Sequence, residues 1–255
     1  MVSVGSLCYN VIIKSKAEVR YRYKRKRIDG CMPVHLDQRL LAIARLVRQD
    51  AYLADIGTDH GYLPVYLAQT GRISRAVAAD INEKPLKQAV AAISAHGLDK
   101  KIATVLSDGL KQVDNRVEDI VIAGMGGELI SSIISAAEWL KNPDKRLILQ
   151  PMTQDVYLRE YLAKQGFCIK EEDIAEDNRH LYVIFSVVFA GEQQCLSPEE
   201  RYAGKSIYKT DALSKKYLQK KIDRLEKISA GLIKSGDTCK ASEFRQLSEK
   251  LKRYL

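Results

Sequence analysis

Short apolar runs and amphipathic segments alternate along most of this chain. Five runs are typical of buried strands, and they lie at 52–56, 75–80, 102–106, 119–123 and 146–150. Segments with apolar residues three or four positions apart predict helices, which lie at 36–47, from 64 onward, and at 83–96, 128–140 and 155–165. Strands joined by helices in this order predict a parallel sheet with helices on both faces, a Rossmann-like α/β fold.

Two further apolar runs, at 167–174 and 181–189, are separated by the polar turn at 176–179. A short polar connection of this kind joins antiparallel strands. We expect this pair to form one edge of the sheet.

Residues 197–255 follow a different pattern. Ser197-Pro-Glu-Glu200 predicts the start of a helix, because Ser197 and Glu200 can form a capping box with proline in the first turn. Leu218, Ile222, Leu225, Ser229 and Leu232 then recur at alternating spacings of four and three, and a second helix follows a break at 235–237. The pattern predicts a C-terminal α-helical coiled-coil hairpin. Its predicted basic outer face comprises Lys215, Lys216, Lys220, Lys221, Arg224 and Lys227.

Charge divides the chain into three parts. The net charge is +9, but it is uneven: residues 1–31 carry eight Lys or Arg against two acids, residues 32–196 eighteen against twenty-two, and residues 197–255 fifteen against eight. Two basic ends suggest contact with a polyanion such as nucleic acid, although solvated basic surfaces would give the same pattern. We expect 32–196 to be the sheet domain and 197–255 to bind nucleic acid.

Residues 1–31 contain a basic block at 20–27 and do not continue the pattern of strands and helices. We expect either a disordered basic arm or an extension upstream of a translation start at Met32. The sequence contains no run of eighteen apolar residues, which is the length that a membrane-spanning helix needs. The five cysteines lack the spacing of a zinc site or a disulfide framework. We therefore expect a cytoplasmic protein without a bound metal.

The turn after the first strand carries the most informative residues. Asp55, Gly57 and Gly61 form the pattern D-x-G-x-x-x-G, with Asp59 inside the turn. The glycines allow a sharp turn and a close ligand, and ligands of such sheets lie beyond the carboxyl ends of the strands. The carboxylates disfavour a pyrophosphate but suit a ligand with sulfonium and ammonium groups. The turn resembles the first motif of class I S-adenosylmethionine-dependent methyltransferases, although a purely structural turn could have the same residues.

The ends of the second and third strands supply two more acids. Asp80 ends the second strand, where a carboxylate can accept hydrogen bonds from both ribose hydroxyls of a nucleoside. Asp108 follows the third strand and suits an adenine amino group, or it forms an Asp-Gly turn with Gly109. Arg39, near the start of the first helix, is a candidate clamp for an amino-acid carboxylate or a solvated helix residue.

The ends of the fourth and fifth strands suggest an acceptor site. Gly124, Gly126 and Gly127 follow the fourth strand and leave backbone open where a methyl acceptor would approach. Gln150 and Pro151 end the fifth strand, and they either line the acceptor pocket or terminate the strand.

Four motifs together closely resemble the bacterial tRNA (adenine-22, N1) methyltransferases, the TrmK family. They are D-I-G-T-D-H-G-Y-L-P at 55–64, S-D-G-L at 107–110, G-M-G-G at 124–127 and L-Q-P-M at 149–152. The resemblance runs from about residue 36 to the C-terminus and includes the coiled-coil tail. One position departs from it, because Gly61 stands where the family often has alanine.

The resemblance implies that S-adenosylmethionine is the cofactor and that N1 of an adenosine in the D-arm of tRNA is methylated. Asp59 and His60 are the candidate catalytic residues. Asp59 would stabilise the cationic product, with His60 as a pocket or proton partner, or both residues would only shape the turn and bind the amino group of S-adenosylmethionine. The candidate cofactor-binding residues are Arg39, Asp55, Gly57, Thr58, Gly61, Asp80, Asp108, Gly109 and Gly124. The candidate substrate-binding residues are Met125, Gly126, Gly127, Gln150, Pro151, Lys216, Lys220 and Arg224.

Two other functions fit parts of the sequence. One is a non-catalytic RNA-binding protein that keeps a degenerate nucleotide fold, and the other is a methyltransferase that acts on a small molecule or a protein. The N-P-P-Y pattern that some adenine-modifying enzymes have after the fourth strand is absent, which disfavours N6-methylation. We expect the protein to be a monomer.

Overall fold

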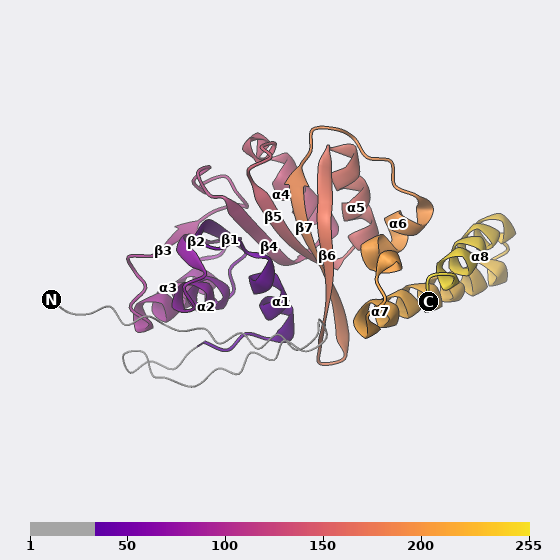
Figure 1. Cartoon of the computed structure of the whole chain (residues 1–255), viewed down its shortest axis with the longest axis horizontal. Helices are drawn as coiled ribbons and strands as arrows, with labels where there is room; N and C mark the ends of the chain where they lie inside the picture. The colour runs from indigo at the N-terminus through magenta and orange to yellow at the C-terminus, as the bar shows by residue number, and fades with distance from the viewer. Residues whose placement is uncertain (1–33) are drawn as a thin grey trace. The chain divides into compact units, whose positions relative to one another are not determined.

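The computed structural model describes residues 34–255. Its centre is a seven-stranded sheet in the order β3-β2-β1-β4-β5-β7-β6 (Figure 1). The strands are β1 (Ala51–Ile56), β2 (Ile73–Asp80), β3 (Ile102–Leu106), β4 (Asp119–Gly126), β5 (Arg146–Thr153), β6 (Phe167–Asp177) and β7 (His180–Phe189). The first five are parallel, while β7 is antiparallel to both β5 and β6. The predicted parallel sheet and its antiparallel edge are confirmed.

Helices cover both faces of the sheet because the strands are apolar on both sides. One face packs against α1 (Gln38–Leu46), α2 (Tyr62–Gln69) and α3 (Glu83–Ala95). The other packs against α4 (Gly127–Ser135), the short 3-10 turn η1 (Glu138–Leu140) and α5 (Asp155–Lys164). Alternate strand residues serve the two cores: Ile120 and Ile122 face α4 and α5, and Val121 faces α1 and α2. Gly97, with φ +64°, follows the end of α3 in a left-handed conformation that ends the helix.

A helical tail follows the last strand. It consists of α6 (Pro198–Ala203), the 3-10 segment η2 (Gly204–Tyr208), α7 (Ala212–Lys234) and α8 (Thr238–Lys252). Ser197 and Glu200 form the predicted capping box. The α7–α8 hairpin closes on a small core that includes Leu218, Ile222, Leu225 and Leu251. In the described part of the chain, no helix combines the length and apolar character that crossing a membrane requires.

The structure corrects three expectations about element boundaries. The helix predicted at 128–140 is two elements, because α4 ends at Ser135 and a separate turn begins at Glu138. The fourth strand does not stop at Ala123, since the β4–β5 ladder continues through Met125↔Pro151 and Gly126↔Thr153. Pro151 therefore does not terminate its strand, and it lies where the register shifts, a place that tolerates a missing N–H. The expectation for residues 1–31 lies outside the described residues.

Candidate active site

The order of the sheet reverses at the junction of β1 and β4, and the predicted motifs meet at this junction. Gly57 follows β1 in a left-handed conformation, with φ +74°. A Cβ at Gly57 would lie 2.3 Å from the Cε methyl of Met125, which comes from the end of β4. The amides of Gly57 and Thr58 both donate to the carbonyl oxygen of Ala79 in β2, at 2.8 and 3.0 Å. In open α/β sheets, this reversal point is where ligands bind.

Asp55 is the most perturbed acid in the crevice. It is the last but one residue of β1, and only 7% of its surface is exposed. Burial raises the pKa of its carboxyl to about 6, against the lowering effects of the Thr58 hydroxyl and the Arg39 guanidinium. An acid that ionises near neutral pH in a cleft is typical of a binding or catalytic site.

Arg39 reaches this crevice from the first turn of α1. Asp37 caps the helix by accepting the amide of Leu40 at 2.6 Å, which fixes the turn that carries Arg39. The Arg39 guanidinium donates to Gln150 Oε1 at 3.1 Å and lies 5.9 Å from the centre of the Tyr182 ring. A Cβ at Gly124 would lie 3.9 Å from Arg39 Nη1, so the guanidinium lies above that glycine.

The Gln150 side chain lies under the crevice and hydrogen-bonds to Arg39 and Gly124. The side chain is fully buried, and its oxygen also accepts the amide of Gly124 at 3.2 Å. Its amide nitrogen donates to the carbonyl oxygen of Pro151 at 3.0 Å. Gln150 therefore supports Arg39 and Gly124 rather than meeting a substrate itself, and Pro151 is also buried.

Asp80 and Asp108 lie at the ends of adjacent strands. One Asp80 oxygen accepts the amide of Asn82 at 2.7 Å, which orients the carboxylate at the end of β2. Asp108 forms an ion pair with Lys111 at 2.6 Å after β3. Ile81 beside Asp80 is 61% exposed, and Leu106 at the end of β3 is also exposed. Two acids flanked by open apolar side chains suit a nucleoside, whose ribose is polar and whose base is flat and apolar on its faces.

Gly109 and Gly61 shape the edges of the site through close packing. A Cβ at Gly109 would lie 3.2 Å from the Ile133 side chain of α4, and φ there is +59°. Gly61 precedes α2 with φ +66°, and a Cβ there would lie 3.2 Å from Ala89 Cβ of α3. The left-handed backbone and this close contact favour glycine at this position.

Asp59 and His60 stand at the rim of the turn. Asp59 is exposed, and one of its oxygens lies 3.1 Å from His60 Nε2. His60 has φ +60°, a conformation that side chains other than glycine adopt at a cost. Its ring stacks on Tyr62 with the ring centres 5.2 Å apart. The three side chains form a polar and aromatic edge that an incoming base can contact.

The glycines after β4 have different environments. Gly124 is exposed with φ +77°, so its backbone is open to the crevice. Gly126 precedes α4 with half-buried backbone. Gly127 is buried, and a Cβ there would lie 2.4 Å from the carbonyl oxygen of Gln154. Its missing side chain makes room for the β5–α5 turn, which corrects the expectation that Gly127 leaves space for the acceptor.

The predicted basic face of the tail needs one correction. Lys216, Lys220 and Arg224 are exposed on α7, and Lys216 pairs with Glu176 at 2.5 Å. Lys221 is only 7% exposed and points inward to Asp155. A lysine on a packed helix is buried when an acid on the facing element compensates its charge, and the sequence does not show which residue faces it.

Sequence reasoning missed several residues of the crevice. Tyr182 comes from β7, about thirty residues after L-Q-P-M, and the sequence carries no sign that it would lie beside Arg39. Ile81, Leu106 and Met152 are exposed at the ends of β2, β3 and β5, and none of them was predicted as a site residue. Within residues 34–255, no three or more His, Cys, Asp or Glu side chains are arranged to hold a metal ion.

The crevice fits S-adenosylmethionine by the chemistry of its groups. The ligand carries an ammonium, a carboxylate, a sulfonium, a ribose and an adenine. Asp55 and Asp80 offer carboxylates, Arg39 offers a guanidinium, and Gly57 and Gly124 keep the floor open between them. The seven-stranded fold and this site define a class I S-adenosylmethionine-dependent methyltransferase, and the family described as "Methyltransferase domain" matches residues 36–185.

Known proteins narrow the class further. The tRNA (adenine(22)-N(1))-methyltransferase of Bacillus subtilis is 36% identical over 159 residues, which are 62% of this chain and 66% of that enzyme. Streptococcus pneumoniae Sp1610 in complex with S-adenosyl-L-methionine is 33% identical with a TM-score of 0.75, over 85% of this chain and 99% of that one. M. capricolum TrmK in complex with S-adenosyl-homocysteine is 29% identical with a TM-score of 0.72, over 86% and 97% of the two chains. The chain belongs to the family of bacterial tRNA (adenine(22)-N(1))-methyltransferases.

Proposed function

We propose that this protein transfers the methyl group of S-adenosylmethionine to N1 of adenosine 22 in tRNA. The observation that carries the proposal is the junction of β1 and β4, where Asp55, Gly57 and Met125 converge in a chain of this family. A degenerate RNA-binding protein would not need a buried acid and open glycines at this point.

The cofactor spans the ends of β1, β2 and β3 in this proposal. Asp55, with Gly57 and Thr58, receives the ammonium end, and Arg39 pairs with the carboxylate. Asp80 accepts the ribose hydroxyls as charge-assisted hydrogen bonds. Asp108 and Gly109 border the adenine, and the exposed Ile81 supplies apolar contact. Gly61 and Gly124 keep the turn and the opposite wall close to the ligand.

The acceptor enters from the side of β4. The N1 lone pair of adenine attacks the methyl carbon while the bond from sulfur to that carbon breaks, which gives S-adenosylhomocysteine and a cationic N1-methyladenosine. Neutral N1 is already a nucleophile, so the protein supplies mainly proximity and orientation. Because N1 lies on the Watson–Crick edge, the base must be unpaired or flipped into the pocket. Met125 and Gly126 border it, and Asp59 with His60 stabilises the positive charge.

The tail holds the tRNA. Lys216, Lys220 and Arg224 lie exposed on α7, and they are placed to contact phosphates without reading sequence. The tail also carries an excess of basic residues. A monomer that acts on tRNA in the cytoplasm fits this account.

The test uses the full-length protein, S-adenosylmethionine with a labelled methyl group, and unmodified tRNA transcripts. A transcript with adenosine at position 22 is compared with one in which that base is guanosine. The proposal predicts label in the first transcript, recovered as N1-methyladenosine, and none in the second. Equal labelling of both transcripts, or labelling of neither, contradicts it.

A further inference from the structure

The tail meets the methyltransferase domain through a buried cluster of charged side chains. Asp155, the first residue of α5, lies at its centre. One Asp155 oxygen receives Lys221 Nζ at 2.5 Å and the Tyr217 hydroxyl at 2.9 Å, both from α7. The same oxygen accepts Arg159 Nη1 at 2.7 Å from the next turn of α5. Two elements that are distant in sequence are thus tied at a single carboxylate.

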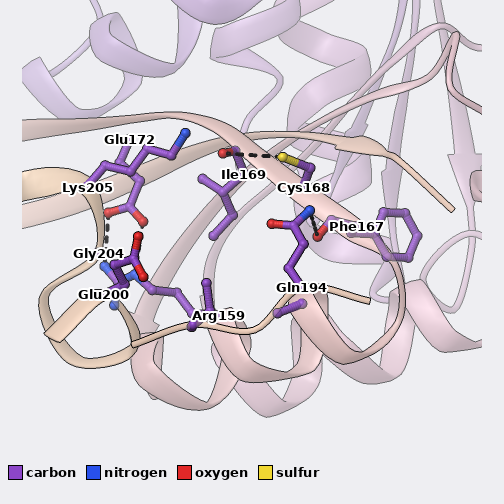
Figure 2. Close-up of a pocket in the computed structure, with 11 residues that line it drawn as sticks. Arg159, Phe167, Cys168, Ile169, Glu172, Gln194, Glu200, Gly204 and Lys205 are labelled. Carbon is purple, nitrogen blue, oxygen red and sulfur yellow. Dashed lines mark hydrogen bonds and ion pairs between the residues drawn. The ribbon is translucent and has the colours of Figure 1, made fainter. Parts of the chain in front are cut away.

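Arg159 extends the cluster to the sheet. Its guanidinium, 1% exposed, donates to both carboxylate oxygens of Glu172 in β6, at 3.0 and 3.1 Å. Gly204 of the tail lies against this pair, since a Cβ there would be 2.2 Å from Glu172 Oε2 and 2.6 Å from Arg159 Nε. Figure 2 shows Arg159, Glu172 and Gly204 beside a cavity of about 250 Å³ between the domain and the tail.

Such a cluster adds little net stability, and its value lies in how it ties α7 to α5. Its charges balance, with two cations and two carboxylates. Buried ion pairs of this kind are often no more stabilising than apolar residues of the same size, because removing charges from water is costly. Removing one partner alone, or displacing α7 from α5, leaves a buried charge uncompensated.

The cluster is also continuous with the acceptor side of the crevice. Asp155 directly follows the β5–α5 turn, and the end of β5 pairs with Met125 and Gly126. The turn contacts the start of α4 twice: Gln154 Nε2 donates to Glu128 Oε1 at 3.2 Å, and the Gln154 carbonyl packs on Gly127. We call Met125 and Gly126, which border the proposed acceptor site, the acceptor wall. The cluster that holds α7 thus directly follows the turn that supports the acceptor wall.

We propose that Lys221 and Tyr217 are positioning residues for methyl transfer, which lock the tail to the start of α5 so that RNA held on α7 presents its target base to the acceptor wall in one geometry. This inference rests on the proposed function, because it assumes that the tail holds the tRNA. It adds that the tail acts as a fixed arm, whose inner face is as necessary as its basic outer face.

The principal variant is Lys221→Met, which keeps the apolar stem and leaves Asp155 paired with Arg159. Its control is Lys234→Met, which removes the same charge from the exposed lysine that ends α7. For Lys221→Met we expect kcat on tRNA to fall about 10- to 100-fold, because misplacement by about 1 Å can cost that much. The dissociation constant for S-adenosylmethionine stays unchanged. Lys221→Arg restores most of kcat, and Lys234→Met behaves as the wild type.

A distance measurement separates positioning from general destabilisation. Spin labels are placed at Cys239 in α8 and at Lys100→Cys in the turn after α3, with the other cysteines replaced by serine. The wild type gives one narrow distance distribution, and Lys221→Met broadens it. If Lys221→Met does not fold, Tyr217→Phe replaces it, since the ring stays and only the hydroxyl contacts with Asp155 and Arg159 are lost.

Two outcomes overturn the positioning role of Lys221 and Tyr217. One is a distance distribution that does not broaden in the folded variant, and the other is a broadened distribution with unchanged kcat on tRNA. Failure of the proposed function looks different. If the wild type does not methylate tRNA, the proposed function is wrong, while the label distances still report whether the tail is fixed. If neutralising Lys216, Lys220 and Arg224 leaves the Michaelis constant for tRNA unchanged, the assignment of RNA to the tail is wrong.

Discussion

At the scale of single residues, burial decides what each acid can do. Asp55 and Asp59 lie four positions apart in one turn, yet Asp55 is buried with a raised pKa and Asp59 is largely exposed. Asp80 is held by the amide of Asn82, which leaves its other oxygen for a ligand. In the proposed function, the same residue type therefore supplies an ammonium partner, a rim charge and a ribose acceptor in one crevice.

The pKa of Asp55 predicts how cofactor binding depends on pH. Its pKa is about 6 without ligand, so below that pH the carboxyl is protonated and loses its attraction for the ammonium group. We expect the affinity for S-adenosylmethionine to fall by up to about tenfold per pH unit below about pH 6. Asp55→Asn should bind weakly with a flat profile between pH 5 and 8. Calorimetry across this range checks both statements, and a wild-type affinity independent of pH would show that Asp55 does not meet the ammonium.

The raised pKa of Asp55 also makes the stability of the unliganded protein depend on pH. This dependence is opposite to that of cofactor affinity, because the contribution of Asp55 to stability is greatest at low pH. A carboxyl whose pKa is raised in the folded state favours folding most while it is protonated, and this contribution is lost as the pH rises through about 6. Binding of the cofactor replaces the lost contribution with an ion pair. The stabilisation by S-adenosylmethionine should therefore be larger at pH 8 than at pH 5.

Asp80→Ala tests the ribose assignment. The change removes two charge-assisted hydrogen bonds, each worth about 1.5–3 kcal/mol, so the dissociation constant for S-adenosylmethionine should rise at least about tenfold. The melting temperature without ligand should change little, because the side chain caps only the short turn to Asn82. Isothermal calorimetry measures the first quantity and calorimetric scanning the second. An unchanged dissociation constant would remove Asp80 from the ribose site.

At the scale of elements, the strand ends carry the site and glycines let them approach. Gly57 and Gly71 both have φ near +70°, but only Gly57 lies in the crevice, and nothing lies within 4 Å of a Cβ built at Gly71. A comparison of substitutions at the two glycines therefore separates the effect of backbone strain from the effect of contact with Met125. Both positions also pay the same kind of conformational cost for alanine.

Gly57→Ala and Gly71→Ala make this comparison. Each should lower the free energy of unfolding by about 1–2 kcal/mol, because alanine disfavours the left-handed conformation. Only Gly57→Ala should also weaken S-adenosylmethionine binding, since it pushes the Met125 methyl into the crevice. Denaturant unfolding and calorimetry give the two quantities. Equal cofactor affinities for the two variants would mean that displacing the Met125 methyl does not narrow the cofactor site.

The sheet was predictable because five buried apolar runs mark its parallel strands and a polar turn marks its edge hairpin. Residues close to these strand ends in sequence, such as Asp80 and Gly124, could be assigned to one edge. Lys221 could not be separated from Lys220, because the burial of a helix face depends on Asp155, sixty-six residues earlier. Tyr182 and the break after Ser135 likewise depend on packing between elements rather than on local pattern.

At the scale of the whole molecule, charge and rigidity have separate roles in the proposed function: basic residues attract RNA, and the fixed tail places it. The sheet domain is slightly acidic, and the tail is basic. The outer face of α7 offers Lys216, Lys220 and Arg224 to a polyanion, while its inner face is fixed to α5 by Lys221 and Tyr217. In this account, affinity for RNA and placement of the RNA are assigned to adjacent faces of one helix.

Replacing Lys216, Lys220 and Arg224 by glutamine tests the outer face. tRNA affinity should fall, and the slope of log affinity against log salt should become shallower by about 2 to 3, because each phosphate contact contributes about one. Lys216 contributes least, since Glu176 already pairs with it. The control replaces Lys100, Lys101 and Lys164 by glutamine. These lysines are exposed just before β3 and β6, at the end of the sheet away from the site. An equal change in slope for both triple variants would mean that the tail has no special role.

The most direct test of the central claim maps methylated adenosine in tRNA from a host that lacks the modification at position 22 and expresses this chain. The account predicts a new block to reverse transcription at position 22, caused by a methyl group on the Watson–Crick edge, and its absence in cells that express Asp80→Ala. Alkaline rearrangement of the product to N6-methyladenosine would identify N1 as the methylated atom. A block at another position, a product methylated at another atom, or no block at all would contradict the account.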